Sequence, residues 1–292
     1  MIKWDGHTHT QFCPHGNGEE LRLYLDRAVE LGFDRYTVSE HPPLPEGWLE
    51  DEKLFFKEIA MEPWELPAYF DHVLKAKEDY QGKLEVTVGL ELDFLPGQES
   101  FSLKLIEPWS HLLDDLVVSV HYLPGTGGMR CIDYTTADFR KGLIEHYGSM
   151  ERVVEEYYRH VELAIEFAAG LPGRKRIGHI NLIEKFAKEL PPVDPSSIEH
   201  HLKRLLPKLV QSGVGVDVNT AGLRVSTCGK PYVPAWFIGK CIEEGVPCVF
   251  GSDAHRPSHV GQDWEWFERT VKRMPFSVES ASRYSTLQYK GR

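Results

Sequence analysis

Short apolar runs and helical patterns alternate along the whole chain. After an apolar start at residues 1–4, further apolar runs predict strands at residues 33–41, 83–95, 115–123, 176–183, 214–223 and 247–255. Apolar residues at helical spacing predict helices at residues 19–31, 67–80, 99–113, 137–170, 195–212, 233–244 and 264–273. Strands that alternate with helices are joined by crossovers and run parallel. The pattern therefore predicts an α/β fold, either a barrel or an open doubly wound sheet.

Residues 42–66 interrupt this rhythm directly after His41. They are rich in proline and aromatic residues and contain the acidic run Glu50-Asp51-Glu52. One interpretation is a solvated excursion with a small apolar anchor. The other, which we favour, is a lid over a site, because loops at strand ends usually carry function.

Nothing else divides the chain. We find no internal repeat and no linker rich in Gly, Ser or Pro, so residues 1–292 are predicted to form one domain. The glycine-rich turn at residues 124–128 is interpreted as a flexible connection. Residues after Pro275 show no helical face and are expected to return as a β-like segment.

Composition limits the possible partners. Of the 292 residues, 41% are hydrophobic and 26% charged, as in an ordinary soluble globular protein. No apolar run has the length of a membrane span, and the N-terminus lacks a signal-peptide pattern, so we expect a cytoplasmic protein without a membrane partner. A net charge of −11 without a basic stripe argues against nucleic acid. Five cysteines without a CxxC pair indicate free thiols. The oligomeric state stays open.

Residue types that bind metals gather at the C-terminal ends of the predicted strands. His7 and His9 share a face because side chains on a strand alternate, and Asp253 and His255 repeat this spacing at the last strand. The other candidates are His41, Glu91, His121 and His179 at strand ends, and His15 in the loop after the first strand. Any one of them alone is more often a hydrogen-bonded core residue than a ligand.

In a parallel barrel these strand ends converge on one mouth, where catalytic residues gather. Nine candidates exceed the roughly three protein ligands of one catalytic zinc. The set suits two or three metal ions, with a carboxylate such as Glu91 or Asp253 bridging. Histidine and carboxylate ligands suit zinc, manganese or iron, and affinity alone does not choose among these metals.

These motifs resemble those of the PHP (polymerase and histidinol phosphatase) family. They are Asp5-Gly6-His7-Thr8-His9-Thr10, Ser39-Glu40-His41, Gly89-Leu90-Glu91, Ser119-Val120-His121, Gly178-His179 and Gly251-Ser252-Asp253-Ala254-His255. Cys13-Pro14-His15-Gly16 and the chain length resemble the histidinol-phosphate phosphatase branch, although many family members have an aspartate where His15 stands. The resemblance implies a distorted (β/α)7 barrel with a trinuclear metal site.

The resemblance also implies how the metals are held and what they do. One metal would be held by His7, His9, Glu91 and Asp253, a second by Glu91, His121 and His179, and a third by His15, His41 and His255. The implied reaction is hydrolysis of L-histidinol phosphate to L-histidinol and phosphate in histidine biosynthesis. A hydroxide between two cations would attack phosphorus, and the cations would neutralise the charge that develops. His255 or a water linked to Asp253 would protonate the leaving oxygen.

Other residues are candidates for holding the substrate. Arg224 and Arg256 follow strand ends, and their planar fork fits phosphate, although a surface ion pair explains each equally well. Ser39 could donate a hydrogen bond to phosphate, and His259 either supports the site or is merely exposed. The substrate's ammonium and imidazole would suit acidic groups, with Asp93, Asp133 and the insertion as possibilities. His200 and His201 are interpreted as surface residues.

Two alternatives stay open. The first is a PHP-type phosphoesterase that acts on another small phosphate ester or on a nucleic-acid end, and the acidic composition disfavours the nucleic acid. The second is a catalytically silent module that only binds metal. Such modules usually lose ligands, whereas all nine positions here hold residues able to coordinate.

Overall fold

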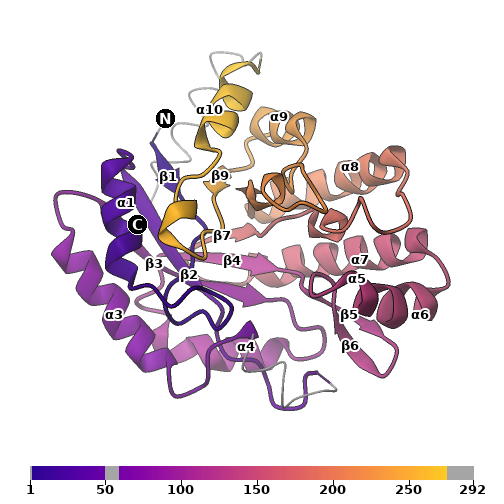
Figure 1. Ribbon diagram of the computed structural model, residues 1–292, viewed down its shortest axis with the longest axis horizontal. Helices are drawn as coiled ribbons and strands as arrows, with labels where there is room; N and C mark the ends of the chain where they lie inside the picture. Colours follow the sequence, from indigo (N-terminus) through magenta and orange to yellow (C-terminus); the bar gives the residue numbers. More distant parts are fainter. Residues whose placement is uncertain (1, 50–58, 275–292) are drawn as a thin grey trace.

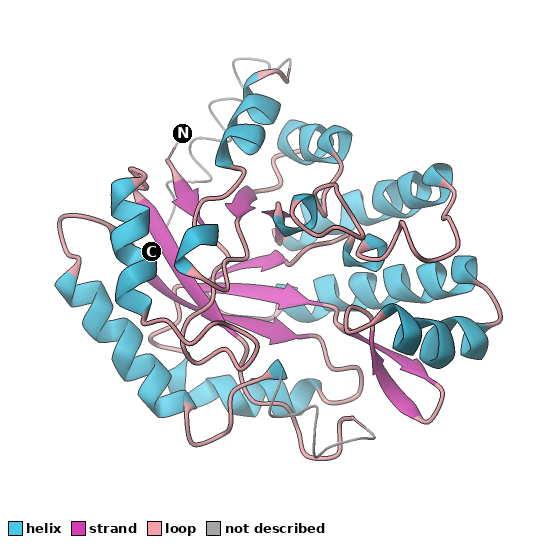
Figure 2. Ribbon diagram, in the orientation of Figure 1, coloured by secondary structure: helices cyan, strands magenta, loops and turns pink. Residues whose placement is uncertain are grey.

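Seven parallel strands curl into a nearly closed barrel surrounded by helices (Figures 1 and 2). This computed structural model describes residues 2–49 and 59–274. In the order of the sheet, the strands are β1 (Trp4–Asp5), β2 (Arg35–Glu40), β3 (Glu85–Asp93), β4 (Asp115–Ser119), β7 (Arg174–Ile177), β8 (Gly215–Asn219) and β9 (Cys248–Gly251). The architecture confirms the predicted α/β barrel.

The barrel closes where its first and last strands meet. The backbone N–H of Gly6 donates to the carbonyl oxygen of Phe250 at 2.8 Å, and that of Asp253 donates to the carbonyl oxygen of His7 at 2.8 Å. The Asp5 carboxylate accepts the backbone N–H of Ser252 at 2.9 Å. This seam places the first histidine motif beside the last motif, although they lie about as far apart in sequence as the chain allows.

Helices cover the outside of the barrel. They are α1 (Leu21–Glu30), α3 (Leu66–Asp79), α4 (Glu99–Ile106), α5 (Thr136–Phe139), α6 (Glu145–Tyr147), α7 (Met150–Ala169), α8 (Pro195–Ser212), α9 (Ala235–Glu243) and α10 (Trp264–Lys272). Helix α8 has the predicted bounds because the Asp194 side chain caps its start, Pro195 is its first residue, and Gly213 ends it with φ of +66°. Among the described helices, none is long and apolar enough to span a membrane.

Two predictions about the middle of the chain are wrong. The glycine-rich turn at residues 124–128 is no flexible connection, because it joins β5 (Tyr122–Gly125) to β6 (Gly128–Cys131) in an antiparallel hairpin. The single helix predicted at residues 137–170 is divided. Gly148, with φ of +83°, ends α6, and the Ser149 side chain caps α7 by accepting the backbone N–H of Arg152.

Two smaller expectations also fail. Strand β7 ends at Ile177, so His179 lies in the loop beyond it rather than inside a strand. His201 is buried and its ring stacks on Tyr158, with ring centroids 4.6 Å apart, so it is no surface residue. The described cysteines are free thiols, as expected.

The described parts of the insertion, residues 42–49 and 59–66, pack on the barrel. They confirm the small apolar anchor, a cluster of Leu44, Trp48, Leu49, Ala60, Leu95, Tyr122 and Cys131. Leu49 also pairs with Met129 of the hairpin. The acidic run at residues 50–52 and the expected β-like segment after residue 275 lie outside the described residues.

The N-terminal end of the barrel is filled by a buried polar cluster. Arg176 donates through Nη1 to both carboxylate oxygens of Asp115 at 2.7 Å, and through Nη2 to the carbonyl oxygen of Gly6 at 2.6 Å. The indole N–H of Trp4 donates to Thr37 Oγ1 at 2.8 Å, which in turn lies 2.8 Å from Thr87 Oγ1. This end of the barrel pairs its buried charges within the chain.

Candidate metal centre at the mouth of the barrel

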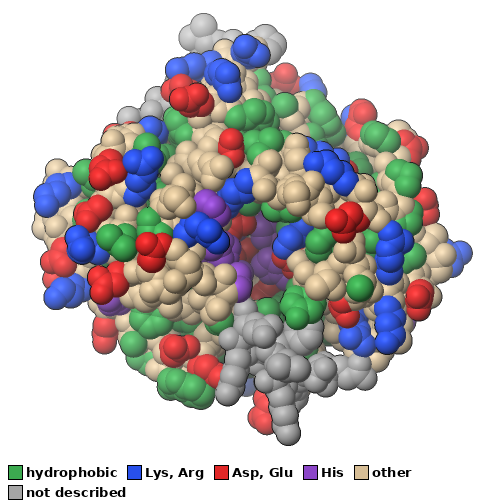
Figure 3. Space-filling view, in the orientation of Figure 1, with side chains coloured by type: hydrophobic (Ala, Val, Ile, Leu, Met, Phe, Trp, Pro, Cys, Tyr) green, Lys and Arg blue, Asp and Glu red, His purple; other side chains and the backbone are tan. Residues whose placement is uncertain are grey.

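The C-terminal ends of the strands surround a cavity of about 650 Å³. Histidine side chains form the floor of this hollow, and lysine and arginine side chains lie around it (Figure 3). The predicted ligands that line it are His15, His41, Glu91, His121, His179, Asp253 and His255. His7 and His9 lie beneath them and are completely buried.

His7, His9, Glu91 and Asp253 form the first predicted group. Glu91 Oε2 lies 3.1 Å from His7 Nε2 and 3.5 Å from His9 Nε2. Asp253 Oδ1 lies 3.2 Å from His9 Nε2. Neither Nε2 atom has a hydrogen-bond partner. Because buried polar atoms in proteins are normally satisfied, two unpartnered nitrogens facing carboxylates fit a divalent cation.

Glu91 reaches the second predicted group through its other oxygen. Oε1 lies 2.9 Å from His179 Nε2 and 3.7 Å from His121 Nε2, and these two nitrogens are 3.1 Å apart. The hydroxyl of Ser119 donates to the same oxygen at 2.6 Å. Glu91 thus presents one oxygen to each group, which is the arrangement of a bridging carboxylate.

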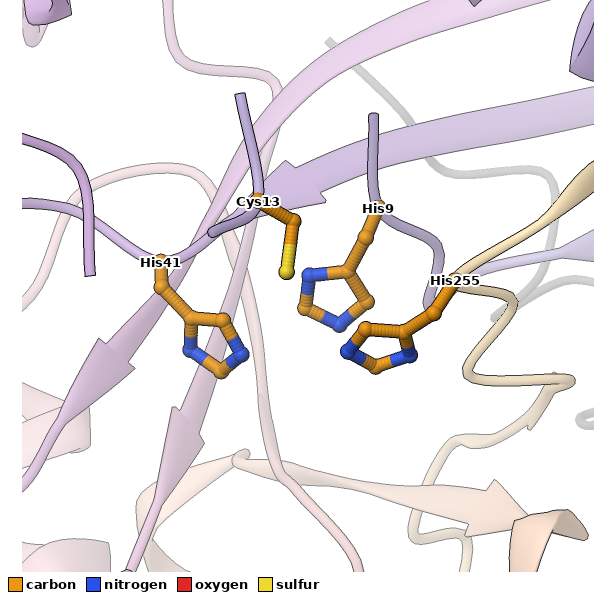
Figure 4. Close-up of side chains that lie close together, drawn as sticks. All are labelled: His9, Cys13, His41 and His255. Atoms are coloured by element: carbon orange, nitrogen blue, oxygen red, sulfur yellow. The ribbon is translucent and has the colours of Figure 1, made fainter. Parts of the chain in front are cut away.

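The third predicted group, His15, His41 and His255, lies nearest the solvent. His15 Nε2 and His255 Nε2 are 2.9 Å apart, and the ring centroids of His15 and His41 are 5.1 Å apart. The structure adds the thiol of Cys13, whose sulfur lies close to side-chain nitrogens of His9, His41 and His255 (Figure 4). Burial, together with the nearby Glu40 carboxylate, raises the pKa of this thiol to about 11.

Three carboxylates orient the ligand histidines, and sequence reasoning did not find these contacts. Asp217 Oδ2 lies 2.7 Å from His7 Nδ1, Glu40 Oε1 lies 3.0 Å from His9 Nδ1, and Asp93 Oδ1 lies 2.6 Å from His121 Nδ1. A carboxylate that accepts the Nδ1 proton leaves the Nε2 lone pair free for a metal. Asp93, expected to contact substrate, therefore serves His121. Strand alternation could have indicated inward-facing acids, since Asp93 shares a face with Glu91 and Asp217 shares a face with Asn219.

The charges of the centre depend on one another. Burial opposes the charged form of His7, but the carboxylates of Glu91, Asp217 and Asp253 outweigh it and hold its pKa well above the usual value. Burial likewise opposes ionisation of Glu91, yet His7 and His41 keep its pKa well below the usual range. Without a cation, protons on His7 and His9 thus balance the ionised carboxylates. A bound cation would take the place of those protons.

The backbone is held in unusual conformations where it presents ligands. Asp253 has φ of +53° and His179 has φ of +20°, values that residues other than glycine rarely adopt. The preceding glycines allow close packing, since a Cβ atom at Gly178 would collide with Ser119 Oγ and one at Gly251 with Asp217 Oδ1. The motif glycines therefore let neighbouring strands approach beneath the ligands.

The structure brings some of the predicted substrate residues to the cavity. Arg224, Arg256 and His259 line it. Nη2 of Arg224 donates to the carbonyl oxygen of Asp253 at 2.7 Å, while its buried Nη1 has no partner. Ser39 is not among the lining residues, because its hydroxyl contacts the backbone of Thr8.

Sequence reasoning missed one further cation at the cavity. Lys185 lines it, and its Nζ lies 2.9 Å from Asp133 Oδ2. Lys185 follows the short helix Leu182–Glu184, in a segment where the sequence shows no motif. Together with the two arginines it places three basic side chains at the cavity, which Glu91, Asp133 and Asp253 also line.

The fold and the site define a barrel protein whose C-terminal mouth gathers side chains able to bind metal ions. The family model for the PHP domain matches residues 5–221, and one described as PHP-associated matches residues 241–275. The chain therefore belongs to the PHP family.

The chain is also similar to individual members of this family. The chain is 36% identical to the histidinol-phosphatase of Bacillus subtilis over 271 residues, which cover 91% of this chain and 98% of the relative. A candidate histidinol phosphatase structure from Listeria monocytogenes superposes with a TM-score of 0.84 at 32% identity, covering 91% of this chain and 100% of that one. A histidinol phosphate phosphatase from Lactococcus lactis, solved with zinc, L-histidinol and phosphate, shares the fold with a TM-score of 0.72 at 17% identity, covering 94% of this chain and 95% of that one.

Proposed function

We propose that this protein is a metal-dependent phosphomonoesterase that hydrolyses L-histidinol phosphate to L-histidinol and phosphate, a step of histidine biosynthesis. The observation that carries the proposal is Glu91, whose two oxygens face two separate groups of histidine nitrogens at the floor of a cavity with basic side chains around it. The likeness to the histidinol-phosphatase of Bacillus subtilis along nearly the whole chain supports this choice of substrate.

Three groups of residues would hold the cations. His7, His9, Glu91 and Asp253 would form the first, Glu91, His121 and His179 the second, and His15, His41 and His255 the third. Zinc, manganese and iron all suit these nitrogen and oxygen ligands. When bound, divalent cations supply a nucleophile at neutral pH and neutralise charge on the phosphate.

The chain's own cations would bind and orient the phosphate. Arg224 already has one guanidinium nitrogen fixed by the carbonyl oxygen of Asp253, so its unpartnered Nη1 is held ready for a phosphate oxygen. Arg256 and Lys185 lie on the same cavity and would hold further oxygens. Ordering these side chains before substrate arrives reduces the entropy lost on binding.

The remaining groups would serve the alcohol half of the substrate. The leaving oxygen needs a proton, which we assign to a water held by Asp253, because His255 would serve the third cation. Asp133 lines the cavity, and Lys185 outweighs its burial and keeps its pKa below the usual range, so its carboxylate is ionised. That negative charge would attract the substrate's ammonium or imidazole.

The test is phosphate release from L-histidinol phosphate by the purified protein, with metal content determined on the same sample. Asp253→Ala should abolish release, whereas Asp71→Ala, on the exposed surface of α3, should not change it. p-Nitrophenyl phosphate and single-stranded DNA serve as parallel substrates, because the expected absence of nucleic-acid binding is still a prediction. A protein that binds metal but prefers another ester would overturn the proposed substrate. A protein that binds no metal and releases no phosphate would overturn the proposed site.

A further inference from the structure

We propose that Cys13 supplies a thiolate ligand to the third cation position, completing a set with His15, His41 and His255, and that its thiol proton is released to solvent when the cation binds. This inference rests on the proposed function only in that cations occupy the mouth of the barrel. It does not depend on which ester is hydrolysed.

The loop after β1 turns the Cys13 side chain inward. The backbone N–H of Cys13 donates to the carbonyl oxygen of Thr10 at 3.1 Å, and that of Gly16 donates to the carbonyl oxygen of Cys13 at 3.0 Å. A Cβ atom at Gly16 would lie 3.3 Å from Cys13 Cβ, so the turn is tight. Only 3% of Cys13 is exposed, and its sulfur points into the space between the rings of His9 and His41, with His255 nearby (Figure 4).

The distances suit a coordination shell. One ligand atom each from His9, Cys13, His41 and His255 lies within 4.8 Å of the others. With bonds of about 2.0–2.1 Å to nitrogen and about 2.3 Å to sulfur, two ligands of one tetrahedral zinc lie roughly 3.3–3.8 Å apart. Small side-chain movements therefore bring these atoms onto one cation.

The histidines decide which of these atoms belong to the third position. His9 Nε2 is fully buried, has no hydrogen-bond partner and faces Asp253 and Glu91, so it serves the first position. His15 Nε2 lies 2.9 Å from His255 Nε2, and on this contact we place His15 in the outer set. The result is one sulfur and three nitrogens, a donor set typical of tetrahedral zinc.

A second cysteine provides the comparison. Cys131 is also buried and, unlike Cys13, lines the cavity, but its thiol donates to Asp133 Oδ1 at 3.0 Å. Among the described groups of potential ligands that lie close together, Cys13 occurs and Cys131 does not. Exposure to the cavity alone therefore does not make a cysteine a ligand here.

A thiolate would make the three positions chemically different. Sulfur ligands favour zinc, whereas positions with only imidazole and carboxylate accept manganese or iron as well. We therefore expect one firmly held zinc at the outer position and two cations that exchange more readily. The proposal thus predicts a mixed metal content for the working protein.

Cobalt(II) substitution tests the ligand directly. Metal-stripped protein is titrated with cobalt, and the near-ultraviolet absorption that a thiolate–cobalt bond produces is followed together with bound cobalt. The band should appear in the wild type and in Cys131→Ser, and be absent from Cys13→Ser. Zinc affinity should fall more than about tenfold in Cys13→Ser, while the affinity of the other positions for manganese stays unchanged.

A further variant separates ligation from folding. Cys13→Asp keeps a cation ligand at the same place and should bind cobalt without the sulfur band. Loaded wild type without the band, or a band that persists in Cys13→Ser, would overturn the proposal. A protein that shows the band but releases no phosphate would keep the ligand and overturn only the proposed reaction.

Discussion

The two ends of the barrel both bury charged side chains, but they satisfy them differently. At the N-terminal end, Arg176 holds both oxygens of Asp115 at 2.7 Å. At the C-terminal mouth, carboxylates and histidines are packed together, and the Nε2 atoms of His7 and His9 have no partner. At the N-terminal end Arg176 has its counter-charge within the chain, although its Nε has no hydrogen-bond partner, whereas at the mouth the unpartnered nitrogens face carboxylates in the manner of cation ligands.

This difference separates stability from function. A buried ion pair with further hydrogen bonds fixes how strands meet, and it offers no open position for a ligand. Unsatisfied buried nitrogens, in contrast, are rare in folded proteins and mark a place where a ligand completes the structure. Parallel barrels in general carry stability at the N-terminal face and chemistry at the C-terminal face. Substitutions at the two ends should therefore have effects of different kinds.

Glu91→Gln should have the largest effect. It removes the charge that faces both inner cation positions, so phosphate release should fall by roughly 10³-fold or more, comparable to losing a main electrostatic contact of a catalytic site. The measurement is kcat with metal content on the same sample. Full metal occupancy together with an undiminished rate would show that Glu91 does not bridge.

Asp115→Asn should affect the opposite end, and stability instead of chemistry. It leaves the buried Arg176 without a counter-charge, which costs about 3–5 kcal/mol of unfolding free energy. Chemical denaturation of the metal-free protein measures this loss. Asp114→Asn is the matched control, because Asp114 forms a partly exposed ion pair with Lys77 that contributes less than about 1 kcal/mol. If both variants lost the same unfolding free energy, the buried Asp115–Arg176 pair would not be the source of stability at this end of the barrel.

The stability of the metal-free protein and the stabilisation provided by bound metal should change with pH in opposite directions. In the metal-free protein, the pKa values of His7 and His9 are held well above 6.5. The stability that these protonated histidines contribute is therefore fully present below pH 6.5 and is lost as the pH rises through their folded-state pKa values. Burial lowers the pKa of His41 and His255, so above pH 6.5 they are neutral and add no slope.

Bound cations need deprotonated ligands, so the stabilisation they provide should grow as the pH rises above 6.5. At a hundredfold excess over Kd, one cation adds about 2.7 kcal/mol. Melting temperatures of metal-free and metal-loaded protein at several pH values measure the difference, with Asp115→Asn as the control in which the same gap is expected. A gap that does not widen with pH would count against histidine ligation.

Sequence reasoning named the candidate ligands that the fold brings together, but not the side chains that orient them. The strand ends and motif spacing located His7, His41, His121 and the others, because parallel strands bring their C-terminal ends together whatever lies between them. That His7 meets Asp217, 210 residues away, depends on strand register and barrel closure, which apolar periodicity does not encode. The same limit applies to Cys13. No second cysteine lies nearby in the sequence to suggest a metal-binding motif, so only the fold shows which side chains surround it.

Caps and turn glycines were present in the sequence, but their importance relative to the apolar pattern was harder to judge. The predicted bounds of α8 coincide with its cap and terminal glycine, and equivalent signals at Gly148 and Ser149 were present within the stretch predicted as one helix. The hairpin of β5 and β6 was missed because its glycines were interpreted as a sign of a flexible connection. They instead permit the tight turn that pairs the two strands. Lys185 could not be found at all, because no pattern marks a lone lysine beside a cavity.

Asp217→Asn should give the smallest of these effects and tests how the mouth is organised. The amide can still occupy the place beside His7 Nδ1, but it no longer enforces a proton there, so the Nε2 lone pair is less reliably presented. Loss of such an orienting partner typically weakens metal binding about 10–100-fold. Zinc affinity measured by competition with a chromogenic chelator should fall in this variant and stay unchanged in Asp114→Asn at the other end of the barrel. If affinity is kept but the metal-free protein loses stability, Asp217 belongs with Asp115 as part of the frame, and the division between an end that pairs its charges within the chain and an end that offers cation ligands would have to be drawn nearer the mouth.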